Sequence, residues 1–180
     1  MVNFKNKKIK IDGERIYLKS LVIKNATKEY CRWLNDPEVN KYLETRHATI
    51  GEIKKYIIEK NKSSNCLFLG IFVKKNKKHI GNVKLEPICF KTHKATFGIL
   101  IGDKMCWGKG IGTDATKLII DYGFKKLGLS KIDLGVISEN VGAIKAYKKT
   151  GFKIDKIVKK SICHGEKMFD AITMSIKKTN

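Results

Sequence analysis

The sequence predicts an α+β domain in which helices flank one central, mixed but mostly antiparallel sheet, in a three-layer, α/β/α-like arrangement. The 180 residues, 42% of them hydrophobic, suit a single domain, and we assign residues 1–180 to it. In the middle of the chain, three apolar runs follow one another with short connections, which is typical of an antiparallel meander. Helical periodicity appears before and after this meander, so the expected order is β-α-α-β-β-β-α-β-α-β-β.

The first third of the chain predicts one strand followed by two helices. Thr27 is placed to cap the first helix, and Thr49 with Glu52 forms the capping-box pattern of the second. Between the helices, Pro37 disfavours helical backbone at the residue before it and so predicts a turn. The expected strand and helices cover residues 15–22, 26–34 and 49–60, respectively.

The rest of the chain predicts six strands and two helices. Alternating or continuous apolar runs mark the strands, and apolar residues at helical spacing mark the helices. Gly151 is expected to end the second of these helices, because glycine favours the left-handed backbone found there. The strands are expected over residues 66–73, 80–89, 95–101, 131–137, 152–159 and 168–176, and the helices over 114–126 and 140–150.

Lysine dominates the charge of the chain, because 38 Lys and Arg against 17 Asp and Glu give a net charge of +21. A field of this sign attracts polyanions, either nucleic acid or a phosphate-bearing small ligand. The lysines are spread over the whole length without a basic block, and no RNP, zinc-finger or KH signature occurs. We therefore expect no dedicated nucleic-acid role, and a biased genomic composition is the alternative explanation of the charge.

Neither the cysteines nor the histidines form a metal-binding pattern. The five cysteines are odd in number and lack CxxC spacing, and the four histidines are scattered. The N-terminal stretch has no apolar signal region, and no apolar run reaches the ~18 residues of a membrane-spanning helix. We expect a cytoplasmic protein without a metal ion or a membrane partner.

A glycine-rich stretch, residues 105–115, lies between an expected strand and an expected helix. Gly108, Gly110 and Gly112 permit tight turns and the close approach of a ligand. The unpaired N–H groups of a helix N-terminus bind phosphate, and Lys109 adds a full charge. The stretch lacks the P-loop pattern, and a simple chain-turning connection is the alternative.

A second motif begins 28 residues after Gly112. Asn140 is a suitable N-cap, and Ala143, Ile144 and Tyr147 share one face of the helix that follows. Read alone, this motif is equally a short amphipathic helix with a packed tyrosine.

Together the two motifs resemble the GNAT superfamily of N-acetyltransferases. The family's loop, R/Q-x-x-G-x-G/A, corresponds to residues 107–112, and its helix, N-x-x-A/S-I-x-x-Y-x-K-x-G-F, to residues 140–152. The resemblance extends over residues 12–178. Trp107 stands where the family usually has Arg or Gln, and the run that it opens is similar to the RimJ/RimL-type branch.

The resemblance implies a sheet that splays to bind acetyl-CoA and a direct transfer of acetyl to an amine. Tyr147 is the expected general acid, with simple packing as its alternative role. The general base is left open between Glu86, Glu139 and neither. The residues expected to contact acetyl-CoA are Ile99, Leu100, Ile101, Trp107, Gly108, Lys109, Gly110, Ile111, Gly112, Thr113, Asn140, Ala143, Tyr147 and Lys149.

The acceptor is a small-molecule or peptide amine, and residues 33–46 are expected to shape its pocket. A nucleotide-linked amino sugar suits the positive field and Arg46, whereas the N-terminal or lysine amine of a protein, such as a ribosomal protein, is the alternative. Polyamines are less expected, because a cationic acceptor usually requires an acidic pocket. A non-catalytic CoA-binding or nucleic-acid-associated module stays open, as does assembly into a homodimer.

Overall fold

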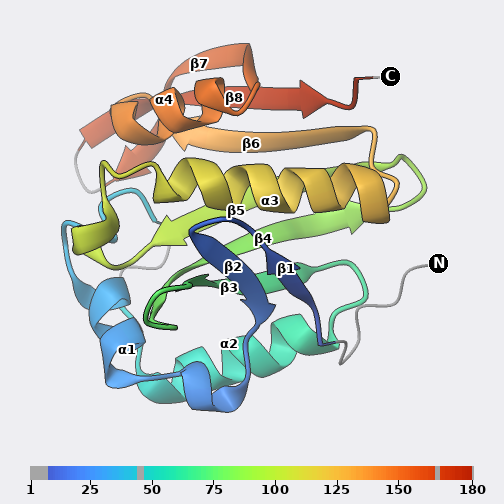
Figure 1. Cartoon of the computed structure of the whole chain (residues 1–180). Helices are drawn as coiled ribbons and strands as arrows, with labels where there is room; N and C mark the ends of the chain where they lie inside the picture. The colour runs from blue at the N-terminus through green and yellow to red at the C-terminus, as the bar shows by residue number, and fades with distance from the viewer. Residues whose placement is uncertain (1–7, 44–46, 165–166, 180) are drawn as a thin grey trace.

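The computed structural model describes residues 8–43, 47–164 and 167–179, which form one open eight-stranded sheet with helices on both faces (Figure 1). The strands are β1 (Lys10–Asp12), β2 (Ile16–Ser20), β3 (Leu67–Val73), β4 (His79–Cys89), β5 (Lys94–Ile101), β6 (Lys131–Ile137), β7 (Lys153–His164) and β8 (Lys167–Lys177). Their order across the sheet is β1-β2-β3-β4-β5-β6-β8-β7.

Six of the seven neighbouring strand pairs are antiparallel, and β5 with β6 is the parallel one. Strands β3, β4 and β5 form the expected meander, because each pairs with the next along the chain. A parallel pair requires a crossover, and helix α3 (Ile111–Lys126) supplies it between β5 and β6. The predicted fold class is confirmed.

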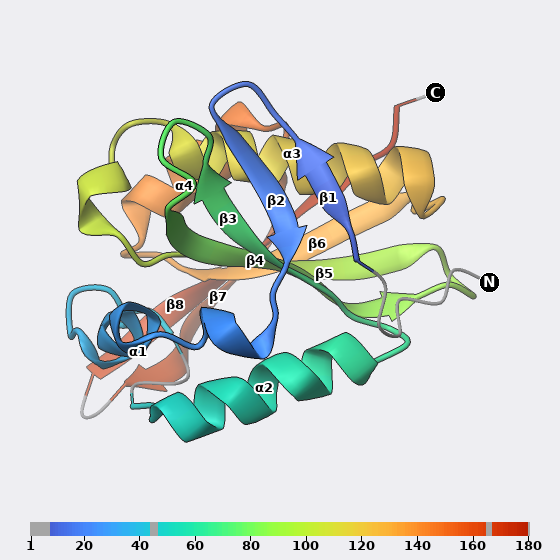
Figure 2. The same ribbon diagram turned by 60° about the horizontal axis from the view of Figure 1, so that its bottom comes forward.

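The helices divide between the two faces of the sheet (Figure 2). Helices α1 (Lys28–Asn35) and α2 (Ile50–Lys62) cover one face, and α3 and α4 (Val141–Lys149) cover the other. Each face has its own hydrophobic core, so the molecule has three layers. We call the two faces of the sheet the α1/α2 face and the α3/α4 face.

The expected helix caps are present in the structure. The Thr27 hydroxyl accepts a hydrogen bond from the amide of Tyr30 at 3.1 Å, and Thr49 and Glu52 cap each other reciprocally. The Asn140 side chain accepts a hydrogen bond from the amide of Ala143 at 3.3 Å. These helix starts follow from side chains near in sequence, which is why sequence reasoning located them.

Three elements differ clearly from the sequence expectation. Strand β7 runs to His164, past the expected end at residue 159, because its pairing with β8 continues to that residue. Helix α3 begins at Ile111 rather than at residue 114, because Gly110 starts it through a left-handed backbone, with φ of 78°, and not through a side-chain cap. Strand β1 was not predicted, since three residues of mixed polarity carry too little pattern, and its pairing with β2 is what makes it a strand.

Candidate functional site

Strands β5 and β6 pair over a short stretch and then part. The parallel ladder joins three residue pairs and ends at Thr96 with Asp133. Beyond this point β5 stays paired with β4, and β6 stays paired with β8. The facing edges of residues 97–101 and 134–137 therefore lack partners in the ladder, and the sheet opens here. We call this opening the wedge, and Thr96 with Asp133 its vertex.

The connection from β5 to α3 lies at the wide end of the wedge and is held by specific contacts. The indole Nε1 of Trp107 donates a hydrogen bond to the carbonyl of Ile101, the last residue of β5, at 2.8 Å. Gly108 and Gly110 adopt left-handed backbone, with φ of 70° and 78°. Both glycines are thus required by the backbone path. Gly112 has no left-handed backbone, so the path itself does not require that residue to be glycine.

The N-terminus of α3 has no side-chain cap, in contrast to α1, α2 and α4. The amide of Asp114 is the first to bond within the helix, to the carbonyl of Gly110 at 3.0 Å. The amides of Ile111, Gly112 and Thr113 precede it and have no acceptor in the preceding turn of the helix. Three aligned donors at the positive end of a helix are suited to bind an anion.

Arg15, which precedes β2, holds this loop in place. Its Nη1 donates to the carbonyl of Lys109 at 2.9 Å, and its Nε and Nη2 contact the carboxylate of Asp114 at 2.9 and 2.8 Å. The guanidinium offsets the negative charge of Asp114 in the first turn of α3. Sequence reasoning missed Arg15, because it lies 94 and 99 residues from its two partners.

Tyr147 lies against the vertex from the α3/α4 face. Its ring meets Phe97 edge-on at 5.8 Å between centroids and lies 5.9 Å from Phe152. Phe97 is the first residue of β5 beyond the ladder. Burial raises the pKa of Tyr147 to about 12, so the phenol keeps its proton over the ordinary pH range.

The other predicted contacts of α4 are arranged around its cap. The carboxamide oxygen of Asn140 is engaged by the amide of Ala143, so Asn140 fixes the start of the helix that carries Tyr147. Ala143 is partly buried against the α3/α4 core, whereas Lys149 is exposed in the last turn of α4. Ile99, Leu100 and Ile101 lie on the unpaired edge of β5.

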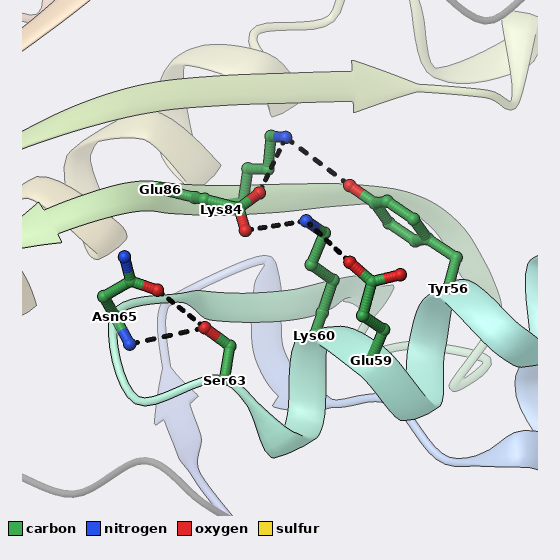
Figure 3. A network of polar contacts seen from close by, with 7 residues as sticks. All are labelled: Tyr56, Glu59, Lys60, Ser63, Asn65, Lys84 and Glu86. Carbon is green, nitrogen blue, oxygen red and sulfur yellow. Dashed lines mark hydrogen bonds and ion pairs between the residues drawn. The ribbon is translucent and has the colours of Figure 1, made fainter.

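Glu86, one predicted base, belongs to an ion-pair cluster on the α1/α2 face (Figure 3). Its Oε1 lies 2.7 Å from Lys60 Nζ and its Oε2 3.1 Å from Lys84 Nζ. Lys84 also donates to the hydroxyl of Tyr56 at 3.4 Å. Burial acts to raise the pKa of Glu86, but the hydrogen bonds from both lysines outweigh it and hold that pKa below its ordinary value. This arrangement favours a structural role.

Glu139, the other predicted base, is exposed where β6 leads into α4, at the wide end of the wedge. Its Oε2 accepts a hydrogen bond from the Ser138 hydroxyl at 2.8 Å, and its carbonyl accepts one from Tyr42 at 3.1 Å. The contact with Tyr42 brings the segment after α1 to this end of the wedge. Arg46, expected beside the acceptor, lies outside the described residues.

The segment after α1 is joined to the loop before α3. Lys104 forms ion pairs with Asp36 at 2.8 Å and with Glu38 at 2.9 Å. Trp33 packs over the backbone of Gly102, where a Cβ atom would lie 2.1 Å from the indole. Residues 33–38 of the expected acceptor segment therefore contact residues 102–104 of the loop before α3.

Over residues 8–43, 47–164 and 167–179, no three His, Cys, Asp or Glu side chains come together in a way that could hold a metal ion. The helices in the described part of the chain are too short or too polar to span a membrane.

A mixed sheet that opens between two parallel strands, with helices on both faces, is an architecture that the chain shares with solved acetyltransferase structures. Residues 15–153 match the family model described as an acetyltransferase (GNAT) domain. The chain belongs to this family.

Curated relatives carry related names. The match to "Probable N-acetyltransferase YjcK" of Bacillus subtilis is 36% identical and spans about half of each protein, 52% of this chain and 51% of YjcK. "Uncharacterized N-acetyltransferase p20" of Bacillus licheniformis is 29% identical over 81% of this chain and 83% of p20. Spermidine N(1)-acetyltransferase of Escherichia coli is 43% identical over 42% of this chain and 40% of that enzyme.

Solved structures share the fold at lower identity. Spermidine N-acetyltransferase from Vibrio cholerae, in complex with CoA and spermine, has a TM-score of 0.83 at 22% identity, covering 92% of this chain and 96% of that one. The microcin C7 self-immunity acetyltransferase MccE, in complex with acetyl-CoA and AMP, has a TM-score of 0.79 at 22% identity, covering 92% and 94%.

Proposed function

We propose that the protein transfers the acetyl group of acetyl-CoA to a primary amine by direct attack. The observation that carries this proposal is the end of the β5–β6 ladder at Thr96 and Asp133, with Tyr147 buried against the residue that follows Thr96. The wedge thus joins a protonated phenol at its vertex to an anion-binding helix at its wide end.

The chain offers suitable groups for each part of acetyl-CoA. The amides of Ile111, Gly112 and Thr113, with Lys109 beside them, would bind the pyrophosphate. The unpaired edge of β5 would bind the amide-containing pantetheine arm as a further strand does, through Ile99 to Ile101. A backbone N–H on this edge would stabilise the charge that develops on the thioester oxygen.

Tyr147 would protonate the departing thiolate. A general acid must carry its proton at the working pH, and a phenol with a pKa of about 12 does so. Asn140 supports this role indirectly, because it caps the helix on which Tyr147 lies.

For the acceptor we propose a nucleotide-linked amino sugar. Within the expected acceptor segment, Asp36 and Glu38 are both paired with Lys104. Such a surface gives a polycation little free negative charge, and the net charge of +21 attracts phosphate. The run that begins at Trp107 supports membership of the RimJ/RimL-type branch. A cytoplasmic location is supported because the proposed reaction consumes acetyl-CoA.

A polyamine is the second candidate, because the similar proteins of Escherichia coli and Vibrio cholerae are named as spermidine acetyltransferases. An acceptor screen by mass spectrometry separates the candidates. The protein would be incubated with acetyl-CoA and UDP- or TDP-linked amino sugars, N-terminal peptides and spermidine, and each acceptor examined for the gain of one acetyl group.

Acetylation of the amino sugars alone would support both the reaction and the acceptor class. Acetylation of spermidine or a peptide alone would keep the reaction and overturn the acceptor. If no acceptor gained an acetyl group while acetyl-CoA still raised the unfolding temperature, the protein would be a non-catalytic CoA binder.

A further inference from the structure

Asp133 occupies the vertex of the wedge, although it belongs to neither sequence motif. It forms the last pair of the β5–β6 ladder with Thr96, and its Oδ1 accepts a hydrogen bond from the Thr96 hydroxyl at 2.8 Å. No other hydrogen bond or ion pair of its carboxylate involves the described part of the chain, so Oδ2 is available to a ligand.

The side chain of Asp133 points to the α1/α2 face. Its neighbours Ile132 and Leu134 are buried in the core of the α3/α4 face, and successive side chains of a strand point to opposite faces. Tyr147 belongs to the α3/α4 core and packs against Phe97, the residue after Thr96. The phenol and the carboxylate therefore approach the same vertex from opposite faces of the sheet.

Two glycines lie next to Asp133 on this face. On the α1/α2 face, the next residues into the wedge are Gly98 on β5 and Gly135 on β6. A Cβ atom at Gly135 would have no neighbour within 4 Å, and one at Gly98 would meet only the stem of Lys84, at 3.3 Å. The two glycines leave room for an amine to reach the wedge next to Asp133.

Both acidic and basic side chains lie near Asp133 on this face. Asp133 on β6 pairs with Ser175 on β8. The Ser175 hydroxyl donates a hydrogen bond to Asp155 at 2.9 Å, and Asp155 forms an ion pair with Lys131 at 3.2 Å. Glu86 is held by two lysines, whereas Glu139 lies at the wide end of the wedge. The charged residues near Asp133 on the same face include Lys94, Lys131, Lys153, Asp155, Lys177 and, further away, Lys60, Lys84 and Glu86.

We infer that Asp133 is the general base of the reaction, an inference that rests on the proposed acetyl transfer. The amine nitrogen forms a bond to the acetyl carbon from the α1/α2 face while one N–H proton passes to Oδ2 of Asp133. The C–S bond breaks, and the thiolate takes the proton of the Tyr147 hydroxyl. Solvent then returns the proton from Asp133 to the Tyr147 phenolate, so both residues regain their starting forms.

Replacement of Asp133 by Asn tests this assignment. Asn keeps the size of the side chain and an oxygen for the Thr96 hydroxyl, but it cannot take a proton. The matched control is Asp155→Asn, which removes a carboxylate from the same face outside the wedge. Acetyl transfer would be measured from pH 6.5 to 9.5 with whichever UDP-linked amino sugar, N-terminal peptide or spermidine the wild-type protein acetylates, and acetyl-CoA affinity by calorimetry.

We expect kcat of the Asp133→Asn variant to fall about 100-fold at neutral pH, with acetyl-CoA affinity unchanged. The deficit should shrink as the pH rises, because hydroxide can then remove the N–H proton in place of the Asp133 carboxylate. Full activity in the variant, or a loss that is equal at every pH, would overturn the role of Asp133 and leave the proposed function standing. A wild-type protein that acetylates none of the three acceptor classes would overturn both.

Discussion

Arg15 contacts the carboxylate of Asp114 through Nε at 2.9 Å and Nη2 at 2.8 Å, although the two residues are 99 positions apart in the sequence. A third contact, to the carbonyl of Lys109, fixes the peptide that leads into Gly110. One side chain from the N-terminal part of the chain thus holds the loop before α3 in place and offsets the charge of Asp114.

Replacing Arg15 by Met should weaken acetyl-CoA binding about fivefold to tenfold, with little change in kcat. The loop loses its fixed position, and the charge of Asp114 is left to oppose the phosphates. Lys117→Met is the control, since it removes an exposed positive charge from the same helix. Calorimetry with acetyl-CoA measures the effect, and equal affinities for the two variants would contradict the role of Arg15.

The three loop glycines should differ in their tolerance of alanine. Gly108 and Gly110 have φ of 70° and 78°, so alanine there costs about 1–2 kcal/mol of stability. At Gly110 the added Cβ would also lie 3.2 Å from Nη2 of Arg15, so this variant should be the least stable. At Gly112 the Cβ meets Ile101 at an ordinary 3.8 Å, and stability should hold.

Urea unfolding of the ligand-free protein measures these differences. Equal stability of the Gly110→Ala and Gly112→Ala variants would show that the backbone geometry of the loop does not limit its stability.

The Tyr147→Phe variant should keep its fold and its affinity for acetyl-CoA, because the ring contacts with Phe97 and Phe152 are retained. Its kcat should fall about 100-fold, since the thiolate loses its proton donor. As burial raises the pKa of Tyr147 to about 12, wild-type kcat should show no loss of this acid between pH 7 and 10. Steady-state kinetics over that range, with calorimetry alongside, checks both statements, and unchanged turnover would leave Tyr147 a packing residue.

Replacing Glu86 by Gln should lower stability more than turnover. Lys60 and Lys84 would lose their shared carboxylate, at a cost of about 1–2 kcal/mol for a half-buried cluster. Because the folded-state pKa of Glu86 is lowered, its contribution is present above the ordinary pKa of 4.5 and is lost as the pH falls through the folded-state value. The stability difference between wild type and variant should therefore shrink from pH 6 to pH 3.

Unfolding curves across that range, together with kcat at pH 7, decide between the two roles of Glu86. A large fall in kcat with unchanged stability would instead support Glu86 as a base.

The helix caps and the loop glycines could be read from the sequence, because each depends on residues a few positions apart. Thr27, Asn140 and the Thr49–Glu52 pair cap their helices as the local pattern predicts. Strand β1 escaped prediction because its only support is the pairing with β2. The start of α3 was placed three residues too late, since the left-handed backbone of Gly110 leaves no side-chain signal.

The sequence by itself determined the fold class, the family resemblance and the two motifs of the site, through short-range spacing and period. Only the tertiary structure decided where the β5–β6 ladder ends, because register between strands far apart in the chain depends on the packing of the whole sheet. The tertiary structure also places Arg15 in contact with Asp114 and Glu86 in contact with two lysines. It places Asp133 and Tyr147 at the vertex, on opposite faces of the sheet. These partners meet across tens of residues, and their charges and distances exist only once the chain has folded.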